Sequence, residues 1–88
     1  NIAYFNRGIA NGNLGHWDKA VADYSNAVGI DPNYAKAYYY RGIAYGNLGQ
    51  EDKARADYSR AIAIDPKFTN MYYNRSDACR KPESGGNQ

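Results

Sequence analysis

The fold is decided by a stretch that occurs twice in succession. Residues 1–34 read NIAYFNRGIANGNLGHWDKAVADYSNAVGIDPNY, and residues 35–68 read AKAYYYRGIAYGNLGQEDKARADYSRAIAIDPKF. The two copies are identical at 21 of their 34 positions. A third copy, TNMYYNRSDACRK, begins at Thr69 and stops at Lys81. Self-similarity at a fixed period of this length is typical of repeat proteins, in which each unit packs mainly against its neighbours.

Each unit contains two helical patterns separated by a glycine. In the first unit, Tyr4, Gly8 and Leu14 belong to a set that recurs every three or four positions, as on one face of a helix. Gly15 then provides a helix C-cap, and Asp31-Pro32 ends the second pattern, because the residue before proline is disfavoured in helical conformation. The spacing predicts a single domain over residues 1–81, with a disordered polar tail at 82–88. Its five predicted helices are at residues 2–14, 17–30, 35–48, 51–64 and 69–81.

The composition fits a small helical domain. Leu, Ile, Val and Phe number only 12, but 10 Tyr and 13 Ala supply the missing apolar area. A formal net charge of +2 predicts no nucleic-acid partner and no membrane surface. One Cys and one His exclude an internal disulfide and a multi-histidine metal site. A chain that starts at Asn1 and shows no signal peptide is interpreted as a fragment or processed product, and we expect an intracellular (cytoplasmic) location.

The repeat resembles the tetratricopeptide repeat, a 34-residue helix–turn–helix unit. That pattern expects an aromatic, a Gly, a second aromatic, Ala, an aromatic, Ala and Pro. The first unit has Tyr4, Gly8, Asn11, Ala20, Tyr24, Ala27 and Pro32, and the second has Tyr38, Gly42, Tyr45, Ala54, Tyr58, Ala61 and Pro66. The third unit has only Tyr72, Ser76 and Cys79. The resemblance implies an all-α fold, a right-handed α-solenoid of antiparallel helix hairpins in which the small residues mark the helix crossings.

The sequence departs from the family pattern in three respects that bear on the interior. Asn11 replaces an aromatic at a buried position near the N-terminal edge. Arginines stand where the family usually has leucine, at Arg7, Arg41 and Arg75. Their head groups either remain solvated or meet the carboxylates of Asp23 and Asp57 between the helices. Glu51 stands where Trp17 packs in the first unit, which predicts a looser second hairpin turn.

No group of residues has the spacing of a catalytic, metal or cofactor site. His16 is interpreted as a surface residue, and Cys79 as a buried structural thiol. Asn74-Arg75-Ser76 has the form of a glycosylation sequon but lies within a predicted helix. The sequence therefore predicts a protein that is not an enzyme and that holds no cofactor and no metal.

The resemblance implies a concave groove lined by the inner face of each first helix. This face is rich in aromatic and amide side chains, which provide contact area and pair with an extended peptide backbone. Gly12 and Gly46 on the same face either admit a ligand backbone or mark fraying helix ends. The residues assigned to partner binding are Phe5, Asn6, Ile9, Asn13, Lys36, Tyr39, Tyr40, Ile43, Asn47, Asn70, Tyr73, Asn74 and Asp77.

These features favour a protein-interaction scaffold that binds a peptide segment of an unidentified protein partner in the groove. The alternative is a structural module that assembles a larger parent protein or forms a homo-oligomer through the solenoid ends. A related 35-residue repeat that reads RNA is disfavoured by the 34-residue period and the near-neutral charge. The clamp by which a branch of the family binds acidic chaperone tails is absent, because its positions hold Phe5, Ile9, Tyr40, Asn70 and Asn74.

Overall fold

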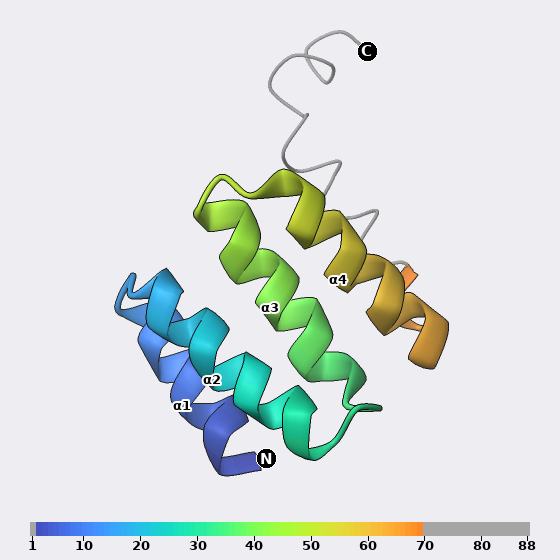
Figure 1. Cartoon of the computed structure of the whole chain (residues 1–88), viewed down its shortest axis with the longest axis horizontal. Helices are drawn as coiled ribbons and strands as arrows, with labels where there is room; N and C mark the ends of the chain where they lie inside the picture. Colours follow the sequence, from blue (N-terminus) through green and yellow to red (C-terminus); the bar gives the residue numbers. More distant parts are fainter. Residues whose placement is uncertain (1, 70–88) are drawn as a thin grey trace, which may run out of the picture.

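The computed structural model describes residues 2–69, which form two antiparallel helix hairpins (Figure 1). The first hairpin pairs α1 (Ile2–Asn13) with α2 (Trp17–Ile30), and the second pairs α3 (Ala35–Asn47) with α4 (Glu51–Ile64). These bounds confirm four of the predicted helices to within one residue, and the described residues contain no strand. The predicted helix at 69–81, apart from Thr69, and the predicted tail at 82–88 lie outside the described residues.

The two hairpins stack side by side rather than closing into a bundle. Helix α1 packs along α2, and α3 packs along α4. The hairpins meet where α2 lies against α3, while α1 reaches α3 over a much smaller area (Figure 1). This neighbour-to-neighbour packing confirms an all-α stack of helix hairpins.

Both hairpins turn in the same way. Gly15 and Gly49 each have a φ of 81°, a left-handed conformation that favours glycine. After them, the backbone N–H of His16 donates to the Asn11 carbonyl at 2.8 Å, and that of Gln50 donates to the Tyr45 carbonyl at 2.9 Å. The prediction of a looser second turn is therefore wrong, because glycine and backbone hydrogen bonds set this turn, independently of the residue at Trp17 or Glu51.

A tyrosine ring occupies the space beside a glycine at each helix crossing. A Cβ atom on Gly8 would lie 2.5 Å from Cε1 of Tyr24. A Cβ atom on Gly42 would lie 2.7 Å from Cε1 of Tyr58 and 3.1 Å from the backbone oxygen of Ala54. Real Cβ atoms essentially never approach another atom within 3.0 Å, as they would here against both tyrosine rings, so the predicted role of the small residues at the crossing is confirmed.

Two carboxylates are buried in the stack, and each is paired with an arginine of the preceding helix. Asp23 is 3% exposed and accepts hydrogen bonds from Nε and Nη2 of Arg7, at 3.0 and 2.7 Å. The amide of Asn11 donates to its other oxygen at 2.8 Å. The Arg7 guanidinium, assisted by Asn11, holds the pKa of Asp23 below its usual value despite burial. Asn11 thus replaces the family's aromatic with a hydrogen bond to this carboxylate.

The second pair lies within the second hairpin and is more enclosed, and its arginine also reaches across the junction between the hairpins. Nε and Nη2 of Arg41 donate to the two oxygens of Asp57, both at 2.8 Å, in a fork that matches carboxylate geometry. Nη1 of Arg41 donates across the junction to the hydroxyl of Ser25 on α2, at 3.1 Å. The Arg41 side chain is 19% exposed, against 64% for Arg7. The prediction that these arginines meet Asp23 and Asp57 is confirmed, and Arg75 lies outside the described residues.

The crossing glycines give the first testable prediction. We expect Gly42→Ala to lower the free energy of unfolding by about 1–3 kcal/mol, because the added methyl group overpacks against Tyr58 and the Ala54 backbone. Gly29→Ala is the matched control, since a Cβ there meets nothing within 4 Å. That variant should be neutral or stabilising, because alanine favours helix more than glycine does. Chemical denaturation followed by circular dichroism measures both, and equal effects would contradict the packing described.

The two ion pairs give the second prediction. Arg41→Ala should destabilise the fold by up to about 3 kcal/mol, because it leaves the buried Asp57 carboxylate without its two donors. Arg7→Ala should cost clearly less, because Arg7 is more exposed and Asn11 still donates to Asp23. Urea unfolding of both variants tests the order. A larger loss in Arg7→Ala would show that enclosure of the pair does not set its contribution.

Candidate functional site

The structure divides the predicted groove residues into three groups. Asn6, Asn13, Lys36 and Asn47 are exposed, and Ile9, Tyr40 and Ile43 are partly buried. Phe5 and Tyr39 are buried, with 7% and 5% of their surface exposed. The remaining assigned residues, Asn70, Tyr73, Asn74 and Asp77, lie outside the described residues.

Phe5 and Tyr39 are structural residues rather than exposed contact surface. The Phe5 ring lies 5.2 Å from that of Tyr34 and 5.4 Å from that of Tyr40. The Tyr39 ring lies 5.3 Å from that of Phe68 and packs against Tyr58 in the same way. In each unit, the ring of the last residue therefore packs against the ring of the fifth residue. The expectation that these two side chains face a partner is corrected, because their neighbours along this aromatic row cover them.

Four of the other seven described groove residues converge on a small hollow at the junction, which we call the interunit notch. Its volume is about 160 Å³, and its lining is mostly apolar. Four predicted residues meet there, Ile9 and Asn13 from α1 with Tyr40 and Ile43 from α3. Residues of α1 and α3 that are 27 or more positions apart in the chain thus share one site. The complete lining is Ile9, Gly12, Asn13, Trp17, Tyr24, Tyr40 and Ile43.

Two of the residues that line the notch were not predicted from the sequence. Trp17 and Tyr24 line it from α2, and neither is among the predicted partner-binding residues. A Cβ on Gly12 would lie 2.9 Å from Cζ3 of Trp17, so the glycine makes room for the indole ring. Neither explanation offered for Gly12 from the sequence is needed. The sequence did contain one signal for this contact, because Trp17, the only tryptophan of the chain, follows Gly12 by five residues.

Polar groups with unused hydrogen-bonding capacity flank the notch. The side-chain amides of Asn6 and Asn13 have no hydrogen-bond partner within residues 2–69. The Asn47 amide instead donates to the carbonyl of Ile43 at 2.9 Å, within its own helix. All three amides can donate to and accept from a bound backbone, but Asn47 has one of its two N–H groups already engaged.

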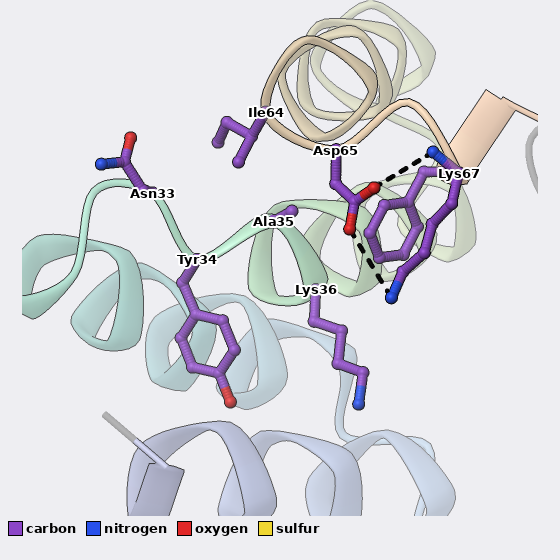
Figure 2. Close-up of a pocket in the computed structure, with 8 residues that line it drawn as sticks. Asn33, Tyr34, Ala35, Lys36, Ile64, Asp65 and Lys67 are labelled. Carbon is purple, nitrogen blue, oxygen red and sulfur yellow. Dashed lines mark hydrogen bonds and ion pairs between the residues drawn. The ribbon is translucent and has the colours of Figure 1, made fainter.

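A second, more open hollow lies at the corner where the α2–α3 loop meets the end of α4 (Figure 2). Its volume is about 290 Å³, and Figure 2 shows the side chains of Tyr34 and Lys36 extending to the same side of the loop. Asp65 at its rim is paired with Lys67, at 3.5 Å between Oδ2 and Nζ. Lys36 forms no ion pair with the described residues, so it is an available cation along the predicted groove.

One residue that lines the notch, Tyr24, has a strongly raised pKa, and the main cause is burial. Desolvation raises the pKa of Tyr24 to about 12, because the ionised ring would sit in the interior next to Tyr40 and Asp23. Burial also raises the pKa of Tyr34. The Tyr24 hydroxyl is therefore neutral at physiological pH, and it acts as a hydrogen-bonding group rather than as a charge.

The part of the chain that the structure describes offers neither a metal site nor a membrane span. Within residues 2–69, no three His, Cys, Asp or Glu side chains gather closely enough to hold a metal ion. None of the four helices is both long enough and apolar enough to cross a bilayer.

Comparison with known proteins identifies the repeat. A family model described as "Tetratricopeptide repeat" matches residues 35–68, and one described as "TPR repeat" matches residues 13–49. The chain belongs to the tetratricopeptide repeat family. Repeats of this family are generally protein-interaction modules and are typically not enzymes.

A solved structure of the same kind supports the assignment. The crystal structure of MamA is similar with a TM-score of 0.76 and 34% sequence identity, over 80% of this chain. The match spans 41% of the MamA chain, so this chain corresponds to less than half of that protein. The search of curated proteins found no match.

The shifted tyrosine gives the third prediction. Because the folded pKa of Tyr24 is about 12 and an unfolded tyrosine titrates near 10, stability should be full below about pH 10 and decline toward pH 12. Tyr24→Phe removes the hydroxyl, so its decline over this window should be shallower than that of the wild type. Urea unfolding at several alkaline pH values measures the slope. An unchanged slope in the variant would contradict the assignment of the shift to Tyr24.

Proposed function

We propose that this protein is a non-enzymatic interaction scaffold that binds an extended segment of a protein partner along α1 and α3, with one apolar side chain of that segment in the interunit notch. The observation that carries the proposal is the notch itself. It is built by three helices of two units, and four of the residues assigned to the groove from the sequence line it.

The size and chemistry of the notch favour a peptide side chain over a small molecule or cofactor. Pockets for small ligands usually measure about 300–1,000 Å³. At about 160 Å³, the notch accommodates a single aliphatic or aromatic side chain. Its mostly apolar lining favours such a group through the hydrophobic effect.

The surroundings of the notch suit an extended backbone. Asn13 at its edge, and Asn6 two helical turns earlier on α1, both carry amides that can pair with peptide N–H and C=O groups. On α3, Lys36, Tyr40, Ile43 and Asn47 recur at helical spacing, so they share one side of the helix. We assign Asn6, Ile9, Asn13, Lys36, Tyr40, Ile43 and Asn47 to the binding surface, and Phe5 and Tyr39 to its support.

The structure offers a built-in signal for binding. Trp17 is the only tryptophan and lines the notch, so a side chain that enters should change its fluorescence. An array of immobilised peptides with varied apolar residues identifies a binder, and titration of that peptide against tryptophan fluorescence gives its dissociation constant. Arrays in which no peptide binds, or binders that leave the Trp17 signal unchanged, would contradict the proposal.

The fourth prediction concerns the wall of the notch. Ile43→Ala should weaken binding of the selected peptide about tenfold, because it removes apolar contact area equivalent to roughly 1.4 kcal/mol. Ile62→Ala is the matched control, since Ile62 is also partly buried but lies on α4, outside the notch. It should leave affinity unchanged. Equal affinities for the wild type and both variants would remove the notch from the binding site.

A further inference from the structure

Cations and tyrosine rings alternate in a row across the second hairpin. Arg41 is central, with its Cζ atom 5.5 Å from the centre of the Tyr38 ring and 5.8 Å from that of the Tyr45 ring. At one end, Cζ of Arg60 lies 5.5 Å from the centre of the Tyr38 ring. At the other end, Nζ of Lys53 lies 5.6 Å from the centre of the Tyr45 ring. Each separation is within the range of a cation–π interaction, and we call these five residues the cationic ladder.

The cationic ladder lies on the side of α3 opposite the interunit notch. Tyr38, Arg41 and Tyr45 follow one another at spacings of three and four residues, so they form one stripe of the helix. Tyr40 and Ile43, which line the notch, lie about half a turn away around α3. The ladder shares no residue with the notch. A ligand on the ladder is therefore independent of a peptide in the notch.

The two outer cations of the ladder have no carboxylate to neutralise them. Asp57 is the only acidic residue three or four positions from Lys53 or Arg60, where side chains on one face of a helix meet. Both oxygens of Asp57 are already occupied by Arg41, and α3 contains no acidic residue. Within residues 2–69, neither Lys53 nor Arg60 forms an ion pair. The ladder thus holds two uncompensated positive charges at exposed positions.

Stacking of repeat units leaves these positions open, as the first unit shows. Lys19 and Asn26 stand on α2 at the unit positions of Lys53 and Arg60. Both are exposed, although the second hairpin is stacked against α2. The second hairpin likewise has the first unit stacked against α3, and its outer cations are still exposed. A further unit stacked in the same way on either side would therefore leave the ladder accessible.

The ladder belongs to the second unit alone among the two described hairpins. In the first unit, Asn11 stands at the position of Tyr45, and Asn26 at that of Arg60. One ring and one cation are thus missing. Of the row, the first hairpin retains only the contact of its central arginine with one tyrosine, at 5.5 Å. The chain itself therefore supplies substitutions that remove the ladder and still suit this backbone.

We propose that the cationic ladder binds an acidic segment of a protein partner, with two carboxylates of that segment paired with Lys53 and Arg60. The two cations are seven residues apart on α4, which separates their positions by about 10 Å along the helix axis. In an extended polyproline-type segment, every third residue points to the same side at intervals of about 9 Å. The ladder therefore fits carboxylates at positions i and i+3 of such a segment.

Two further properties favour an acidic protein segment as the ligand. The rings hold both cations in place, which reduces the conformational entropy that binding would otherwise cost. Two single positive charges match two carboxylates, whereas stable binding of a nucleic acid engages several phosphates at once. The formal net charge of the whole chain is only +2, so little charge outside the ladder is left to attract a longer polyanion.

The fifth prediction is tested by nuclear magnetic resonance with the full 88-residue chain. The probe is a peptide with blocked ends in which two aspartates flank a pair of alanines. At low ionic strength, where surface charges are little screened, it should shift the Nε–H resonance of Arg60 and the backbone amide resonance of Lys53. The indole N–H resonance of Trp17, in the notch, should not move. Because exposed ion pairs are weak, we expect saturation at millimolar peptide.

Matched variants separate the ladder from general charge attraction. Arg60→Asn restores the residue of the first unit and should weaken binding about fivefold, the effect of losing one exposed ion pair. Arg55→Asn removes the same charge from α4 outside the ladder and should bind nearly as the wild type does. A peptide of the same composition with its two aspartates adjacent should bind more weakly, because its carboxylates cannot reach both cations.

The proposal is overturned if the first peptide shifts no resonance of the ladder, if both variants lose affinity equally, or if the two peptides bind equally well. A shift at Trp17 in place of Arg60 would put the acidic peptide in the notch and would also overturn it. A single-stranded oligonucleotide that shifts the ladder resonances at lower concentration than the peptide would show a nucleic-acid site instead. The peptide selected for the notch should bind Arg60→Asn unchanged, so the two proposals succeed or fail separately.

Discussion

The architecture depends on one contact, a tyrosine ring resting on a glycine where the two helices of a unit cross. Tyr24 lies on Gly8 and Tyr58 on Gly42, and a single methyl group at either glycine would intrude on the ring. Because the helices approach closely there, each ring is held at a fixed place in the hairpin. Tyr24 then contacts Tyr40 of the next unit, with 6.2 Å between ring centroids. The crossing inside one hairpin thus sets the surface on which the next is stacked.

Arginine side chains help to fill the interior of a chain that has few large aliphatic residues. Where the family usually places leucine, Arg41 extends its aliphatic stem between helices and ends on a buried carboxylate, Asp57. The charge is compensated on both oxygens, and no buried side-chain nitrogen or oxygen among the described residues lacks a hydrogen bond. A leucine would pack against its neighbours but would form no directional hydrogen bond. The guanidinium instead specifies both its own hairpin, through Asp57, and its neighbour, through Ser25.

Features that depend on neighbours within one unit could be predicted from the sequence, and features that depend on the next unit could not. The helices, the glycine turns and the crossings follow from local spacing, as Gly8 and Gly15 show. The burial of Phe5 could not be predicted in this way, because Tyr40 of the next unit covers it together with Tyr34, the last residue of its own unit. Helical spacing groups Phe5 with Ile9 on one side of α1, but spacing does not indicate which part of that side the following unit encloses.

The interunit notch is a product of stacking, and this has a consequence for specificity. A lone hairpin supplies Ile9 and Trp17 but lacks the wall that Tyr40 provides, so no hairpin contains the notch by itself. At the junction that the structure describes, unit position 17 lies in the lining of this hollow. That position holds Trp17 in the first unit and Glu51 in the second. Because the crossings that fix the backbone do not involve this position, its side chain can differ between units while the stack stays the same.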